Sequence, residues 1–112
     1  MSEQINIAIA QVNPTVGAIG ANAERVRAAR AQAAAAGADL VVFGELVLCG
    51  YPPEDLVLKQ AFQRSIEETV AKLAAQTADG GPGLLIGAPW RVEDALYNAA
   101  LLLDGGEVVA VR

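Results

Sequence analysis

The 112-residue sequence has no histidine and a single cysteine, Cys49. Without an imidazole, this chain cannot by itself build the serine–histidine or cysteine–histidine pairs that activate many nucleophiles. One cysteine excludes an internal disulfide, and a lone cysteine without histidine argues strongly against a zinc centre. We therefore expect no metal site within these residues.

Positive charge and long apolar runs are also scarce. Eight lysines and arginines stand against thirteen acidic residues, a formal net charge of −5. Phosphate backbones are bound by clustered basic residues, and the one cluster, Arg25, Arg27 and Arg30, falls on a predicted helix as a solvated face. No run reaches the ~20 apolar residues of a membrane span, and the first residues lack the charged start of a signal peptide. We expect a cytoplasmic protein that binds neither nucleic acid nor membrane.

Apolar strand-like runs alternate with helix-forming stretches. Five elements are predicted in order: strand 5–12, helix 21–36, strand 38–45, helix 59–78 and strand 84–89. The first and last of these strands are apolar on both faces, which predicts burial on both sides. A short helical piece is predicted to open at Pro53. Strand, helix and strand in this order favour parallel pairing through a right-handed crossover.

Two further β-rich runs, "LYNAALLLD" and "EVVAVR", follow a predicted polar connection at 91–95. The two glycines between them, Gly105 and Gly106, are typical of a hairpin turn. The sequence thus predicts one α/β domain, with βαβαβ followed by a β-hairpin. Nothing in the chain would cover the third strand and the hairpin, so we expect exposed apolar surface, open sheet edges and self-association.

The stretch "VVFGELVLCGYPPEDL", residues 41–56, holds the first candidate for a functional residue, Glu45. In open α/β sheets, ligands gather at the carboxyl ends of strands, and Glu45 follows such an end. Its apolar neighbours 46–48 would partly desolvate the carboxylate, as suits a general base. The alternative is a solvent-facing residue that only ends the strand.

Three other residues carry a functional and a structural interpretation. Cys49 is a potential nucleophile, but its neighbours supply no activating base or positive charge, which favours a buried structural role. Tyr51 precedes two prolines and either lines a pocket or belongs to a rigid turn. Asn98 interrupts an apolar strand, needs a hydrogen-bond partner if buried, and is interpreted as orienting a loop. The glycines of "GAIGAN" lack the spacing of a nucleotide-binding loop, so no cofactor site is expected.

Four stretches in this order, "IAIAQVNPTVGAIGANAERV", "AGADLVVFGELVLCGYPPEDL", "LLIGAP" and "LYNAALLLDGGEV", resemble the carbon–nitrogen hydrolase (nitrilase) superfamily. The likeness is greatest to the glutaminase domains of glutamine-dependent NAD⁺ synthetases and covers essentially the whole chain. It implies an α-β-β-α sandwich, with residues 1–112 as the N-terminal portion of the glutaminase domain and the synthetase domain absent.

The resemblance also implies site residues. The family uses a glutamate, a lysine and a cysteine, and its glutamate corresponds to Glu45, the general base. Tyr51 corresponds to a tyrosine near the active site, and Gly44 replaces the proline that usually precedes the glutamate. The lysine and the nucleophile lie beyond this chain, which alone is expected to be inactive. Residues of the right type but at other positions are Lys59, Lys72 and Cys49.

The implied reaction begins with release of ammonia from glutamine. A separate synthetase domain, which binds ATP and Mg²⁺, then uses ammonia to convert nicotinic acid adenine dinucleotide to NAD⁺. The expected partners are glutamine, the rest of the glutaminase domain, the synthetase domain and further copies of the protein in a homo-oligomer. Two alternatives stay open: a stand-alone amidase of the same superfamily and a non-catalytic α/β interaction module.

Overall fold

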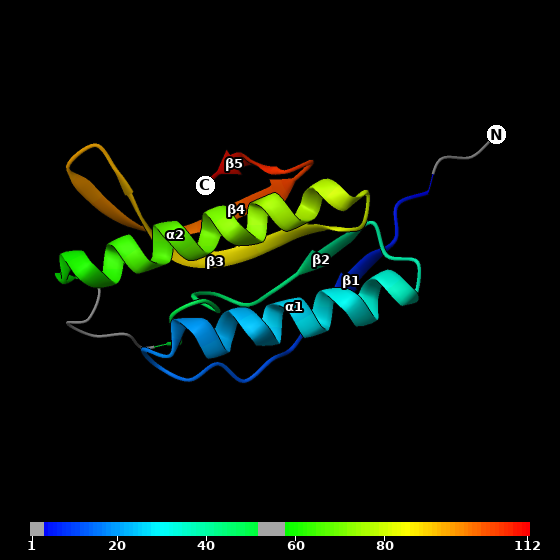
Figure 1. Ribbon diagram of the computed structural model, residues 1–112, viewed down its shortest axis with the longest axis horizontal. Helices are drawn as coiled ribbons and strands as arrows, with labels where there is room; N and C mark the ends of the chain where they lie inside the picture. Colours follow the sequence, from blue (N-terminus) through cyan, green and yellow to red (C-terminus); the bar gives the residue numbers. More distant parts are fainter. Residues whose placement is uncertain (1–3, 52–57) are drawn as a thin grey trace.

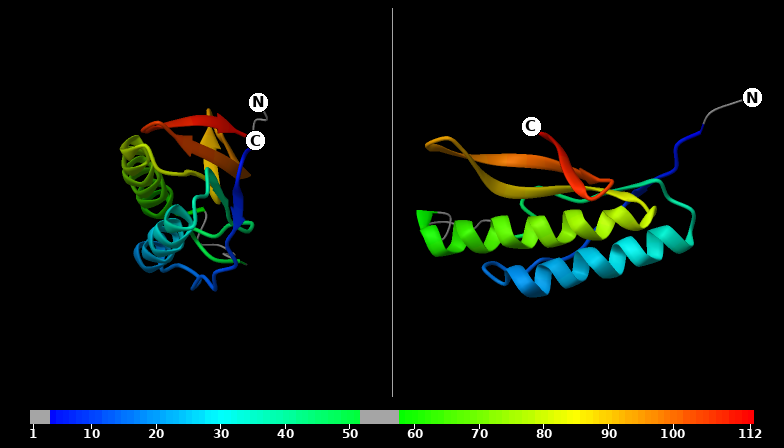
Figure 2. Two further views of the ribbon diagram at one scale, coloured as in Figure 1. Left: turned by 90° about the vertical axis from the view of Figure 1, so that its right-hand side faces the viewer. Right: turned by 45° about the horizontal axis from the view of Figure 1, so that its top comes forward.

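Two long helices cover one face of a five-stranded sheet (Figures 1 and 2). The structure is a computed structural model and describes residues 4–51 and 58–112. The packing of helices on a sheet confirms the predicted α/β class. The elements are β1 Ile7–Ile9, α1 Ile19–Ala35, β2 Leu40–Val42, α2 Gln60–Gln76, the 3₁₀ turn η2 Thr77–Asp79, β3 Gly83–Val92, β4 Ala95–Asp104 and β5 Glu107–Val111.

The strands lie in the order β1-β2-β3-β4-β5. The first three are parallel, with α1 and α2 as their connections, and β3, β4 and β5 pair antiparallel. This is the predicted βαβαβ order followed by a hairpin, whose turn holds Gly105 and Gly106 at φ 59° and 89°. The glycines are required here because other residues rarely adopt positive φ.

The helix ends also follow the sequence signals. Helix α1 stops at a left-handed Gly37, φ 83°, whose N–H bonds Ala34 O at 3.0 Å while Ala38 N–H bonds Ala33 O at 2.9 Å. These two hydrogen bonds satisfy carbonyl groups in the last turn of the helix, which have no partner within the helix. The short helix predicted to open at Pro53 lies outside the described residues.

Strand β3 corrects the prediction of a polar connection at 91–95. It runs through Arg91 to Val92, which pairs with Ala95, so that the turn consists of Glu93 and Asp94. Both faces of the hairpin tip are exposed to solvent, so polar residues can continue the strands there. Polar composition therefore does not signal the end of the strand.

Strand β1 corrects a second prediction, that of burial on both faces. Ile5, Ile7 and Ile9 are 66%, 54% and 78% exposed, whereas Ala8 and Ala10 are half-buried against the core. In the described residues the helices cover only one face of the sheet (Figure 2). The exposure of the isoleucines therefore assigns them to the face that the helices leave open. This apolar face and edge are consistent with the expected self-association, which stays a prediction.

Candidate active site

Glu45 opens a tight turn that follows β2. The turn bonds to the neighbouring strand β3 through Leu48 N–H to Gly87 O, at 3.2 Å, and closes with Gly50 N–H to Leu46 O, at 2.8 Å. Residues 46–50 are buried, but Glu45 itself is exposed. The expected desolvation by residues 46–48 is therefore wrong for the described structure: these side chains enter the core and leave the carboxylate in contact with solvent.

Gly87 allows the turn of Glu45 to lie directly on the sheet. A Cβ at this position would be 2.9 Å from Gly44 O and closer still to Leu46 N. A Cβ atom this close to backbone atoms would clash with them, so the close contact between the turn and β3 requires glycine at position 87. The signal in the sequence was a single glycine inside the strand run "LLIGAP", which often marks a close backbone approach.

The side chain of Glu45 has a partner on a distant strand. Asn98, on β4, donates a hydrogen bond from Nδ2 to Glu45 Oε1. Strand β4 alternates, with Ala99 and Leu101 buried beneath the helices and Asn98 and Ala100 exposed on the other face. Asn98 was interpreted as orienting a loop; in the structure its partner is the carboxylate of the candidate base.

Glu45 and Asn98 line one pocket of about 270 Å³ on the face of the sheet that the helices leave open. Phe43, Leu85 and Arg112 are among its other walls, and Glu45 is the only acidic side chain among the described residues that line it. The carboxylate is thus exposed to solvent but sits in a concave surface rather than on a convex end of the strand. This geometry favours the functional interpretation over the alternative of a residue that merely ends β2.

Buried Asn22 fixes the same turn from the helix side. Its Oδ1 accepts from Thr15 N–H at 2.8 Å and from Arg25 Nη1 at 2.9 Å, and its Nδ2 donates to Thr15 O and to Leu48 O, at 2.8 and 3.0 Å. One side chain therefore joins α1, the loop before it and the turn of Glu45. Sequence reasoning missed Asn22; the available signal was a polar residue on the apolar side of an alanine-rich helix.

Cys49 has the structural role that the sequence favoured. It is fully buried, and its thiol lies 3.3 Å from Gly50 O. Burial raises the pKa of the Cys49 thiol to about 11, which keeps it protonated and unreactive near neutral pH. Cys49 therefore belongs to the core and not to the pocket.

Tyr51 is placed less favourably than its predicted role requires. Its side chain is 66% exposed, and it is not among the residues that line the pocket of Glu45. The prolines that follow it lie outside the described residues. Its role in substrate binding stays a prediction.

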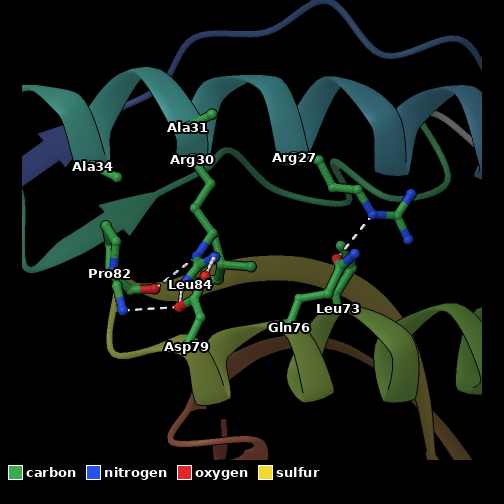
Figure 3. Close-up of a pocket in the computed structure, with 10 residues that line it drawn as sticks. Arg27, Arg30, Ala31, Ala34, Leu73, Gln76, Asp79, Pro82 and Leu84 are labelled. Atoms are coloured by element: carbon green, nitrogen blue, oxygen red, sulfur yellow. Dashed lines mark hydrogen bonds and ion pairs between the residues drawn. The ribbon is translucent and has the colours of Figure 1, made fainter.

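A larger cavity, of about 360 Å³, lies between α1 and α2 (Figure 3). Arg30 donates to both carboxylate oxygens of Asp79, at 2.7 and 3.0 Å, and to Pro82 O at 2.8 Å. The Arg30 guanidinium and the Gly81 amide hold the pKa of Asp79 down to about 2. Arg27 bonds Gln76 across the same cavity at 2.9 Å. The side chains of Arg27 and Arg30 thus join α1 to α2 and to the segment that follows α2. The prediction that they form a solvated face is therefore wrong.

The part of the chain that the structure describes contains no cluster of three or more metal-ligating residues. In the same residues, neither helix has the length and apolar character needed to cross a membrane.

The sequence model of the carbon–nitrogen hydrolase family matches residues 6–112, and the chain belongs to this family. It is 50% identical over 110 residues to a glutamine-dependent NAD(+) synthetase of Rhodobacter capsulatus. The alignment covers 98% of this chain and 20% of that protein. The chain therefore spans about a fifth of the length of this curated relative.

Solved structures agree with this assignment. A glutamine-dependent NAD⁺ synthetase from Acinetobacter baumannii superposes with a TM-score of 0.87 and 31% identity, over 95% of this chain and 20% of that one. An amidase of the nitrilase superfamily, from Nesterenkonia, superposes with a TM-score of 0.84 at 24% identity, over 96% of this chain and 42% of that one. At 24% identity, the match to the amidase shows a common fold alone. The predicted nitrilase-like fold class is confirmed by the family match and the superpositions together.

Proposed function

We propose that residues 1–112 form the first part of a glutaminase domain and that Glu45 is its general base. The observation that carries this proposal is the exposed Glu45 carboxylate in a pocket at the end of β2, held by one neutral hydrogen-bond donor. Membership of the carbon–nitrogen hydrolase family supports amide hydrolysis as the reaction class. The names of the relatives support glutamine as the amide.

The proposed chemistry follows from the resemblance. Glu45 takes the proton of a cysteine thiol as the sulfur attacks the glutamine carboxamide, and a lysine stabilises the resulting oxyanion. The protonated Glu45 then gives its proton to the departing ammonia as the carbon–nitrogen bond breaks. Water finally hydrolyses the thioester to glutamate and restores the thiol. The cysteine and the lysine come from outside residues 1–112, so this chain alone is inactive.

The register of the last hairpin supports convergence of these groups. Arg112 and Ala100 exchange two backbone hydrogen bonds, at 2.9 and 2.7 Å. Side chains two residues apart on a strand share a face, and directly opposed residues are close neighbours. If the strand continued, the second residue after Arg112 would face Asn98 beside Glu45. The resemblance implies a lysine just after this strand, which supports the proposal.

The proposal extends to the complete enzyme. Its relatives are named glutamine-dependent NAD⁺ synthetases, which supports a separate domain that binds ATP and Mg²⁺ and amidates nicotinic acid adenine dinucleotide. We further propose a cytoplasmic homo-oligomer, with Tyr51 near the bound glutamine. We call the polypeptide that contains both domains the complete enzyme.

The test is Glu45→Gln in the complete enzyme, with NAD⁺ formation measured from glutamine and, separately, from added ammonia. Loss of a general base lowers the glutamine-dependent rate by about 10²–10⁴-fold, whereas the ammonia-dependent rate stays unchanged. Glu107→Gln, at an exposed glutamate of β5 outside the pocket, is the matched control and leaves both rates unchanged.

Two results would contradict the proposal. Equal loss of both rates in Glu45→Gln would show that Glu45 is structural, and retention of the glutamine-dependent rate would remove it from the chemistry. Glutamine hydrolysis by an unaltered protein that makes no NAD⁺ from ammonia would instead indicate a stand-alone amidase.

A further inference from the structure

We propose that Asn98 is a positioning residue, which holds one oxygen of Glu45 so that the other receives the proton. The inference rests on the proposed function of Glu45. Asn98 Nδ2 donates to Glu45 Oε1, and among the residues that the structure describes no other side chain bonds this carboxylate. One oxygen is therefore anchored, and both residues line the same pocket.

The anchor is needed because the backbone fixes only the start of the Glu45 side chain. The turn is seated on Gly87 of β3, and Asn98 is paired with Pro89 of the same strand. The backbones beside Glu45 and at Asn98 are thus set against positions of β3 that are two residues apart. Glutamate has several rotatable bonds and is exposed here, so its carboxylate would sample many positions without a partner. The amide selects one of them.

An amide also suits the chemistry better than a cation. A guanidinium beside a carboxylate favours the ionised form and weakens its affinity for a proton, as Arg30 does at Asp79. Arg112 lines the same pocket and carries a positive charge, whereas the amide of Asn98 donates a hydrogen bond without adding a further one. It can therefore orient a carboxylate that must accept a proton during the reaction.

Two substitutions separate positioning from packing. Asn98→Ala removes the donor, and we expect kcat for glutamine to fall about 10–100-fold with little change in KM, because the base is misplaced rather than lost. Asn98→Asp keeps the shape but sets two carboxylates side by side. Like charges favour protonation of one of them, so the acidic limb of the kcat/KM profile moves to higher pH.

The experiment compares the unaltered complete enzyme with Asn98→Ala, Asn98→Asp and a control, Asn6→Ala. Asn6 lies just before β1 and also donates one side-chain hydrogen bond, to Gly37 O at 3.3 Å, away from the pocket. The readouts are kcat and KM for glutamine, the pH profile and the ammonia-dependent rate. We expect kcat to fall only in the Asn98 variants, with the ammonia-dependent rate unchanged in all of them.

An unchanged kcat in Asn98→Ala, or an Asn98→Asp profile that overlays the unaltered enzyme, would overturn the inference. So would equal loss of glutamine- and ammonia-dependent rates, which indicates general damage. If Glu45→Gln abolishes the glutamine-dependent rate but the Asn98 variants do not, only the positioning role fails. If Glu45→Gln itself is fully active, the proposed function fails.

Discussion

Two carboxylates at opposite ends of the sheet differ in what holds them. Asp79 lies just before β3 and accepts two hydrogen bonds from Arg30 and one from the Gly81 amide, at 2.8 Å. Glu45 follows the end of β2 and accepts from the side chain of Asn98. Both are exposed, so exposure does not distinguish them.

The hydrogen-bond partners of the two acids, and not the sizes of the neighbouring cavities, distinguish the proposed general base from an acid in a structural ion pair. The larger cavity, at Asp79, holds an acid whose charge is already matched by a guanidinium and whose pKa is lowered to about 2. Such a group is a weak base and belongs to a structural ion pair. The smaller pocket is lined by Glu45, whose carboxylate accepts its hydrogen bond from a neutral side-chain amide.

The largest expected effect comes from the strand beneath Glu45. Gly87→Ala places a methyl group 2.9 Å from Gly44 O and against the turn, which must move. We expect a loss of about 2–3 kcal/mol in the free energy of unfolding, together with loss of glutamine-dependent activity. The control is Gly20→Ala in α1, where nothing lies within 4 Å of the new methyl group. Equal thermal midpoints for the two variants would refute the close approach.

Asn22→Ala tests the other support of the Glu45 turn. It leaves Thr15 and Leu48 without buried hydrogen-bond partners, which costs about 2 kcal/mol of stability. Thermal unfolding of the complete enzyme checks this loss, with Asn6→Ala as the matched control. A midpoint no lower than that of the control would show that Asn22 does not secure the turn.

Cys49→Ala tests whether the one cysteine of this chain takes part in chemistry. We expect glutamine-dependent activity within about twofold of the unaltered enzyme and a stability loss of about 1 kcal/mol, typical of a small core change. Because the pKa of the buried thiol is raised from 9.0 to about 11, the unaltered protein should lose stability as pH rises across that interval. Loss of glutamine hydrolysis in a folded Cys49→Ala variant would contradict its core role.

Arg30→Gln has the smallest expected effect at neutral pH. Exposed ion pairs contribute little to stability, so the thermal midpoint should fall less than in the variants above, and glutamine-dependent activity should not change. The pKa of Asp79 is lowered from 3.8 to about 2, so its stabilising contribution is present above about pH 4 and is lost as pH falls towards 2. Unfolding midpoints measured over this interval should decline less in the variant; an identical decline would remove Asp79 from the acid response.

Local sequence patterns predicted the parts of the structure that depend on neighbouring residues. The alternation of apolar and helix-forming segments indicated the element order, Gly37 the end of α1, and the double glycine at 105–106 the hairpin turn. The position of Glu45 after a strand likewise placed it at the carboxyl end of the sheet. Each of these features is encoded within a few residues of where it occurs.

Contacts between distant residues were not predictable in the same way. Asn98 and Glu45 are 53 positions apart, and the clamp of Arg30 on Asp79 spans 49. The exposure of Ile7 in β1 depends on what covers the sheet, which an apolar pattern cannot specify. The need for glycine at position 87 appears only when the turn of Glu45 is laid upon it.

The most direct test replaces each of the two carboxylates with its amide and measures one ratio. In the complete enzyme, the rate of NAD⁺ formation from glutamine is divided by the rate from ammonia, for Glu45→Gln and for Asp79→Asn. The account predicts that the ratio collapses in Glu45→Gln and stays at the unaltered value in Asp79→Asn. An equal ratio in both variants, or a collapse confined to Asp79→Asn, would contradict it.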